Sequence, residues 1–169
     1  GDPVWFGRGQ DANGALRTCF MAPDDIIGYA DHYVQSTERH PMDFLATCIQ
    51  ERGWDKGRIG VEMDNYYYSA RAHDVLLTGL PDADVSDCTG LVNWQRAVKS
   101  ETELSYMRKA GKITDRIIDM IRDKAAPGVK KNVMAADIYH TAITGTDDAW
   151  GDYPAIVPLL PSGMDATAA

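Results

Sequence analysis

Cysteine is scarce in this chain, and its placement suits neither a disulfide framework nor a zinc site. Cys19, Cys48 and Cys88 are odd in number and widely spaced, and none belongs to a Cys-x-x-Cys pair or adjoins a histidine. Secreted disulfide scaffolds and structural metal sites both require paired or closely spaced cysteines. We therefore interpret these residues as reduced, mostly buried thiols of a cytoplasmic protein, without a catalytic or metal-binding role.

Positive charge is also in short supply. The 169 residues contain 17 Lys and Arg against 25 Asp and Glu, which gives a formal net charge of −8. Nucleic-acid binding draws its affinity from clustered basic side chains that release counterions, and the pair Lys130 and Lys131 is too small for that role. No apolar run is long enough to cross a bilayer, and the chain does not open on a secretory leader. We expect neither a nucleic-acid nor a membrane partner.

Familiar cofactor and nucleophile motifs are absent as well. The sequence has no Gly-x-Gly-x-x-Gly, no phosphate-binding loop and no Gly-x-Ser-x-Gly elbow. His73 and His140 lie within helical patterns, where a surface or half-buried position is the better interpretation of each. Asp147 and Asp148 could together bind a cation, but an isolated acidic pair is usually just solvated. Residue types alone therefore identify no catalytic set.

Strand and helix signals alternate through the first half of the chain, which is typical of an α/β fold with βαβ units and a mixed or largely parallel sheet. Short apolar runs predict strands at 3–6, 25–29, 58–63 and 84–87. Helices or helical turns are expected at 11–20, 41–52 and 66–80. The helix at 41–52 has proline in its permitted first turn and ends at Gly53.

A long amphipathic helix follows this α/β region. Ser100 and Glu103 form a capping box, in which the serine hydroxyl accepts from a free backbone N–H and the glutamate carboxylate reaches back to the N–H of the cap. Charged residues alternate with an apolar series, so we expect one buried face and one exposed face. The series consists of Leu104, Met107, Gly111, Thr114, Ile118, Ile121 and Ala125. Ala126-Pro127-Gly128 ends the helix.

A second helix is expected from Asn132 to about Ala142, followed by a polar loop at 145–151. A strand is then predicted at 153–160. Pro154 and Pro158 interrupt this strand, so it must lie at an edge or a bend, because proline cannot donate to a ladder.

Two stretches of this sequence resemble a known enzyme family. One is the linker Arg96-x-x-Lys99-Ser100, with acidic residues and a Met-Arg-Lys-Ala turn leading into the Ile-rich helix. The other is Asp152-Tyr153-Pro154-Ala155-Ile156-Val157-Pro158-Leu159-Leu160-Pro161-Ser162-Gly163. Together they resemble the creatinase, prolidase and Xaa-Pro aminopeptidase family, whose catalytic domain has the pita-bread fold, and the resemblance covers essentially the whole chain.

The resemblance implies a domain arrangement. Residues 1–92 would form an incomplete creatinase-type N-terminal α/β domain, residues 93–99 a linker, and residues 100–169 the first helices and strand of a truncated pita-bread α+β domain. Family members are longer, so the chain is expected to be an internal segment or a fragment of such an enzyme, and a homodimer. In most relatives a pair of divalent metals lies downstream, whereas creatinase has none. The implied catalytic and metal-binding residues lie outside Gly1 to Ala169.

Two groups of residues are candidates for binding a small-molecule substrate. In the first, Ser162 and Gly163 lie with Tyr153 and Ile156 in the segment that precedes the first active-site histidine of the family. A hydroxyl at a strand end can bind a polar ligand and glycine allows close approach, although an ordinary turn is the alternative. Met164-Asp165 stands where many relatives have Asn two residues after the glycine, which casts doubt on a peptide substrate.

The second group is Asp31 and His32, in the run Tyr29-Ala30-Asp31-His32-Tyr33. In this family the N-terminal domain commonly reaches over the active site of the partner subunit, and an aspartate beside a histidine could fix its tautomer. The alternative is that both residues serve turn structure and point to opposite faces. Arg39-His40-Pro41 could belong to the same surface, and Tyr66-Tyr67-Tyr68 is expected to serve packing or an interface.

The expected function follows from the resemblance: a hydrolase of a non-peptide C–N bond in a small molecule, namely a cyclic amidine. Two alternatives remain at this stage. One is a metal-dependent Xaa-Pro dipeptidase or aminopeptidase with the same architecture, and the other is a non-catalytic pita-bread module that binds a protein partner through its acidic surface.

Overall fold

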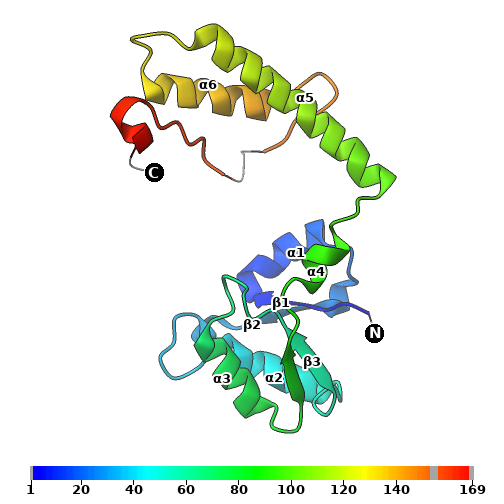
Figure 1. The fold of residues 1–169 in the computed structure, drawn as a ribbon. Helices are drawn as coiled ribbons and strands as arrows, with labels where there is room; N and C mark the ends of the chain where they lie inside the picture. Colours follow the sequence, from blue (N-terminus) through cyan, green and yellow to red (C-terminus); the bar gives the residue numbers. More distant parts are fainter. Residues whose placement is uncertain (1, 153–155, 168–169) are drawn as a thin grey trace. The chain divides into compact units, whose positions relative to one another are not determined.

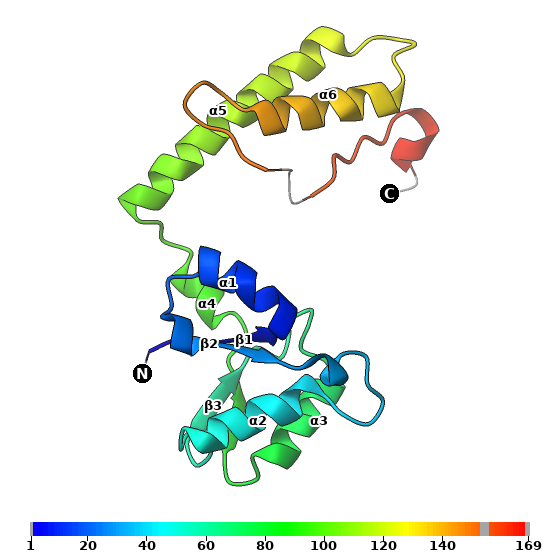
Figure 2. The same ribbon diagram turned by 180° about the vertical axis from the view of Figure 1, so that it is seen from behind.

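The computed structural model describes residues 2–152 and 156–167. The chain divides into two compact units, Gly1–Arg96 and Ala97–Ala169. Every strand named in the described residues belongs to the first unit, and the second is built around two long helices (Figures 1 and 2).

The first unit opens with a parallel strand pair joined by a helix. The elements are β1 (Trp5–Arg8), α1 (Ala12–Thr18) and β2 (Ile26–Tyr29), with single 3-10 turns at Gly9–Asp11 and Pro23–Asp25. Trp5 lies opposite Ile26 in the ladder. A parallel pair needs a crossover connection, and α1 provides it. The predicted strand at 25–29 is confirmed, whereas the strand predicted at 3–6 lies two residues later, because Pro3 has no N–H to donate.

A second parallel pair follows in the same unit. The elements are α2 (Pro41–Glu51), β3 (Arg58–Val61), α3 (Ala70–Gly79) and β4 (Asp84–Asp87). Arg58 lies opposite Asp84, and Val61 lies opposite Asp87. The expectation of an α/β fold with parallel strands is confirmed. In the described residues, however, the four strands form two separate two-stranded sheets instead of one.

The core of the first unit lies between α2, α3 and the β3–β4 pair. Its buried members are Ala46, Val61, Leu76 and Leu80. Leu80 is only 1% exposed. At Gly79 an added Cβ would lie 2.5 Å from the Cβ of Ala46, closer than two carbons can approach. Glycine at this position therefore allows α3 to pack directly against α2.

The prediction that Tyr66, Tyr67 and Tyr68 begin a helix is wrong. The side chain of Asn65 accepts from the backbone N–H of Tyr67 at 2.9 Å, which forms a turn typical of Asn. The N-cap of α3 is Ser69, whose hydroxyl accepts from the N–H of Ala72. Local side-chain hydrogen bonds thus delay the helix start by several residues.

A short helix, α4 (Leu91–Gln95), precedes the second unit and was not predicted. Its apolar residues Leu91, Val92 and Trp94 are 59%, 52% and 80% exposed, so there is no buried stripe that a periodicity could reveal.

The second unit consists mainly of the antiparallel neighbours α5 (Glu101–Lys124) and α6 (Lys131–Thr144), which lie side by side in both views (Figures 1 and 2). The capping box is confirmed: the Ser100 hydroxyl accepts from Glu103 N–H at 3.3 Å, and Glu103 Oε2 accepts from Ser100 N–H at 2.7 Å. Lys124 and Asp137 tie the helices together with a 2.8 Å ion pair. No described helix is both long and apolar enough to cross a bilayer.

The predicted buried face of α5 is only partly found in the structure. No residue of α5 is fully buried, and Met107 and Ile118 of the predicted stripe are 54% and 47% exposed. Leu104 and Ile121 of the predicted stripe are half-buried, together with Ile113, Ile117 and Met120, which lie outside it. Apolar residues thus occupy more than one face of this helix, and the sequence alone does not reveal which of them face α6.

The helix predicted at 132–142 is confirmed within α6, whereas the strand predicted at 153–160 is not found in its described part. Residues 156–160 are irregular, and the chain then enters a 3-10 turn at Gly163–Thr167. A strand exists only in a ladder, and no described strand pairs with this segment. Pro158 and Pro161 also remove two backbone donors.

Candidate functional site

Ser162 and Gly163 lie where the C-terminal segment passes the junction of α5 and α6. Ser162 lines a cavity of about 220 Å³, which is otherwise mostly apolar. Its other lining residues are Ile121, Ala125, Ala126, Val129, Lys131, Met134, Leu160 and Pro161. Gly163 has a φ of +59° and open space around it. Glycine is therefore needed here for its backbone conformation, in addition to any role in ligand approach.

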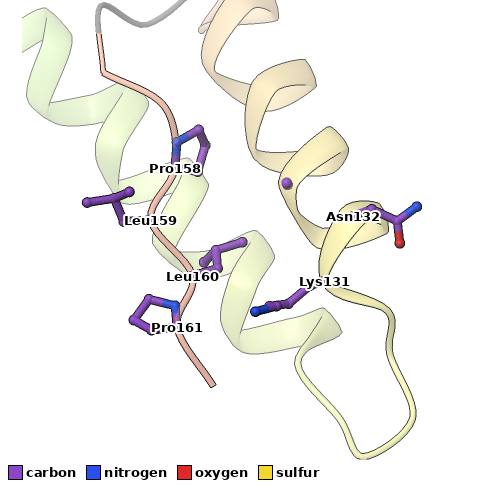
Figure 3. Close-up of a pocket in the computed structure, with 7 residues that line it drawn as sticks. Lys131, Asn132, Pro158, Leu159, Leu160 and Pro161 are labelled. Carbon is purple, nitrogen blue, oxygen red and sulfur yellow. The ribbon is translucent and has the colours of Figure 1, made fainter. Parts of the chain in front are cut away.

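A larger neighbouring cavity, of about 540 Å³, lies between α6 and the same segment. It is lined by Lys131, Asn132, Ala135, Pro158, Leu159, Leu160 and Pro161. Figure 3 shows the Lys131 side chain extending toward Leu160 and Pro161, whereas Asn132 points away from them. This arrangement offers an apolar wall with one ammonium group. The residues that line the two cavities include no carboxylate and no imidazole.

The other two residues of this candidate group do not join Ser162 in a cavity. Ile156 is 77% exposed and lines neither cavity. Tyr153 lies outside the described residues. Of this predicted group, the structure places only Ser162 in a cavity, where it lies with Lys131, which was not predicted, and with an apolar surface.

Asp31 and His32 lie in the first unit, in a 3-10 turn at Asp31–Tyr33 directly after β2. The carboxylate of Asp31 accepts from Arg8 Nε at 2.8 Å, and this hydrogen bond lowers the pKa of Asp31. The described partner of Asp31 is thus the guanidinium at the end of β1, not the neighbouring imidazole. His32 is exposed and lies against the ring of Tyr33, with centroids 4.3 Å apart.

The tyrosines around Asp31 and His32 have a packing role. The rings of Tyr29 and Tyr33 both contact Phe44 of α2, at centroid distances of 6.4 and 6.1 Å. They hold the end of β2 against α2 and leave the His32 ring on the exposed side of the cluster. The geometry accounts for Tyr29, Asp31 and Tyr33 structurally, and His32 is the member whose side chain is accessible to a ligand or a partner.

His40 has a role that the sequence analysis did not identify. Its Nδ1 accepts from Met42 N–H at 3.1 Å, and Asp43 Oδ2 accepts from His40 N–H at 2.8 Å, so His40 is the N-cap of α2 in a capping box. Burial lowers the pKa of this imidazole, the nearby Arg71 lowers it further, and Asp43 opposes both effects. Histidine is an uncommon N-cap, and the sequence analysis identified this helix start from the Pro41 that follows.

The described residues contain no group of three His, Cys, Asp or Glu side chains close enough to hold a metal ion. In the turn after α6 of the second unit, Asp148 lies 4.0 Å from Lys112.

Comparison with known proteins places these residues in context. No family model matches the chain. Ectoine hydrolase of Halomonas elongata is 52% identical over 174 residues, an alignment that covers 99% of this chain and 44% of that protein. An uncharacterized hydrolase/peptidase of Sinorhizobium fredii, y4tM, is 42% identical over an alignment that covers 92% of this chain and 40% of that protein.

Solved structures show the same relationship at the level of the fold. The Xaa-Pro dipeptidase from Bacillus anthracis superposes with a TM-score of 0.60 at 18% identity, over 80% of this chain and 34% of that one. The X-Pro aminopeptidase from Thermotoga maritima gives 0.59 at 15% identity, over 80% and 35%. The chain belongs to the creatinase/prolidase family. The family and the fold class expected from the sequence are thereby confirmed, and the homologues are hydrolases.

The chain spans less than half the length of the curated creatinase/prolidase relatives that it matches. Its described residues supply two apolar cavities and an exposed histidine, without a complete set of reacting groups. Residues that line a further cavity beside α5, such as Tyr106 and Trp150, were also missed. Ile113, an apolar residue of α5 outside the predicted stripe, was the one sequence signal on that side of the helix.

Proposed function

We propose that this chain is part of a creatinase/prolidase-type hydrolase that opens the cyclic amidine ring of ectoine. The observation that supports the proposal is the 52% identity to ectoine hydrolase of Halomonas elongata, which extends over 99% of this chain. The Xaa-Pro peptidases share the fold at less than 20% identity and carry no argument about the substrate. We further propose that the enzyme is a cytoplasmic homodimer.

The proposed reaction is the addition of water to the amidine carbon. A histidine and a glutamate downstream of the Ser162-Gly163 turn would remove the proton from the attacking water. The ring C–N bond then breaks, and the departing nitrogen takes up a proton. The oxygen of the water becomes the carbonyl oxygen of an N-acetyl group, so the product is an N-acetylated diaminobutyrate. General acid and base groups speed both proton transfers.

The described residues would form walls of this site. The Ser162 hydroxyl can hydrogen-bond a polar group of the substrate, and the Lys131 ammonium lies in the neighbouring cavity, where it favours a carboxylate. An apolar surround excludes competing water and strengthens both contacts. In the proposed homodimer, His32 would approach the substrate of the partner subunit.

The test is a proton NMR time course of ectoine with the dialysed full-length protein that contains this chain. One sample contains no additive, and a parallel sample contains a strong chelator. We expect an N-acetyl signal to appear as the ectoine signals decline. A signal that persists with chelator indicates a metal-free reaction. Loss of the signal with chelator would show that ectoine is the substrate and that its hydrolysis requires a metal ion.

A proline-containing dipeptide serves as the comparison substrate. Cleavage of the dipeptide without ectoine turnover would replace the proposal with a Xaa-Pro peptidase. Turnover of neither substrate by folded protein would contradict hydrolysis and favour the binding-module alternative.

A further inference from the structure

We propose that a cavity between α5 and the turn after α6 binds a small zwitterion that carries a carboxylate and a planar organic cation, such as an amidinium or guanidinium group. The cavity has a volume of about 300 Å³, at the lower end of the range for small-molecule sites. It is lined by Tyr106, Lys109, Ala110, Ile113, Asp148, Ala149 and Trp150.

The turn that forms one wall is held in place by backbone contacts. Thr146 and Ala149 pair in a two-residue bridge, with Thr146 N–H donating to the carbonyl of Ala149 at 2.6 Å. Gly145 ends α6 with a φ of +60°, and its carbonyl accepts from the guanidinium of Arg116 on α5. An added Cβ at Gly145 would overlap the backbone of Ala149. The turn is therefore docked on α5, and the cavity is formed before any ligand arrives.

The cavity presents charges of both signs. Asp148 accepts from the Thr146 hydroxyl at 2.8 Å, and this bond, followed by the field of Lys112, lowers the pKa of the carboxyl. Asp148 is therefore ionised at neutral pH. Lys109 on α5 lines the same cavity and is half-buried, and its charge also lowers the pKa of Asp148, although the two side chains do not form one of the ion pairs of the described residues. A carboxylate of the ligand would pair with Lys109, and a cationic group would pair with Asp148.

Two exposed aromatic rings complete the cavity. Tyr106 and Trp150 are 67% and 74% exposed, although both line the cavity. The face of an aromatic ring attracts a delocalised cation, and tryptophan does so most strongly. Apolar Ala110 and Ile113 also line the cavity and suit the hydrocarbon body of a small ring. The cavity thus combines two aromatic rings with one anionic and one cationic side chain. This combination matches a planar zwitterion better than an ordinary apolar compound.

The inference stands on the geometry of α5 and the turn, and not on the proposed reaction. Ectoine carries both required groups and is therefore a suitable probe. We would label the full-length protein with 5-fluorotryptophan and titrate it with ectoine. The fluorine resonance of Trp150 would be assigned by its loss in Trp150→Phe, which reports on this cavity even if the ligand also binds elsewhere.

We expect a saturable shift of the Trp150 resonance and none of the exposed Trp94. Lys109→Gln and Asp148→Asn should each weaken the apparent affinity about 5- to 10-fold, the usual effect of losing one charge-assisted contact. Arg108→Gln and Asp147→Asn remove equal charges from neighbouring exposed positions and should leave the titration unchanged.

Proline and acetamidinium test the ligand class, since each lacks one of the two required groups, and both should bind more weakly than ectoine. A Trp150 resonance that does not move up to about 100 mM ectoine, where a millimolar site is saturated, would overturn the proposal. Equal loss of affinity in the test and control variants would also overturn it. Binding without turnover refutes the proposed reaction alone, and turnover without a Trp150 shift refutes this site alone.

Discussion

The imidazole Nδ1 of His40 accepts the backbone N–H of Met42 at 3.1 Å and thereby caps α2. A protonated Nδ1 has no lone pair, so the cap exists only in the neutral ring. The folded-state pKa is lowered from the ordinary 6.5, chiefly by burial. The folded state therefore binds fewer protons than the unfolded state, and the cap stabilises the protein fully above pH 6.5 and less as the pH falls through the folded pKa.

We expect His40→Ser to remove this part of the pH dependence, because a serine cap does not titrate. Urea unfolding at about pH 8 and about pH 5.5 measures this pH dependence. Between these two pH values the free energy of unfolding of the wild type should fall by up to about 1 kcal/mol more than that of the variant. His140→Ser, at an exposed position of α6, is the control and should keep the wild-type dependence. Parallel profiles for His40→Ser and the wild type would show that the cap does not titrate.

The start of α5 depends on one serine hydroxyl. Ser100→Ala removes the acceptor for Glu103 N–H and should cost about 1 kcal/mol in the free energy of unfolding. Ser105→Ala lies inside the same helix, where alanine is the better helix former, and should be neutral or slightly stabilising. Amide hydrogen exchange at Glu103 provides a local measure. Protection at Glu103 that survives Ser100→Ala would mean that the helix starts elsewhere.

Two glycines of the two units should respond oppositely to the same substitution. Gly79→Ala forces a Cβ against the Cβ of Ala46 and should destabilise the first unit by about 1–3 kcal/mol. Gly111 lies inside α5 with open space around it, so Gly111→Ala should stabilise the helix by about 0.5–1 kcal/mol. Thermal unfolding of both variants and of the wild type measures these changes in stability. Stabilisation by Gly79→Ala would show that α2 and α3 are not in close contact.

His32 offers a test of the predicted contribution to a partner's active site. In the full-length protein, His32→Ala should lower ectoine turnover without changing the melting temperature, because the exposed ring supports no described hydrogen bond. Asp31→Asn keeps the shape of its residue but weakens the ion pair with Arg8, and is the structural control. Unchanged kinetics of His32→Ala would show that His32 does not contribute to the active site.

Local signals in the sequence were sufficient for much of the fold. The capping box at Ser100, the Gly53 stop after α2 and the apolar runs of β2 to β4 each depend on residues close in sequence, and each is found in the structure. Side-chain competition for backbone groups was harder to predict. Asn65 and Ser69 determine where α3 begins, although the tyrosines before it fit a helical pattern.

Long-range pairing was the main limit on predicting the site. Ile113, Ile117 and Met120 of α5 are half-buried although they lie outside the predicted stripe, and no property of α5 alone selects them. Ser162 could be placed beside a cavity only after the segment that follows α6 was seen to return to the α5–α6 junction. Likewise, Asp31 was matched with its neighbour His32 in the sequence, whereas its partner Arg8 lies 23 residues away and meets it across the β1–β2 ladder.

The two parallel strand pairs also bear on how the chain folds. Each pair is closed by one intervening helix, and α5 and α6 are joined by a short connection, so most stabilising contacts lie between residues close in sequence. Loop-closure entropy is small for such contacts, and chains with low contact order fold quickly. Each strand pair and the helix pair therefore closes over its own short stretch of the chain.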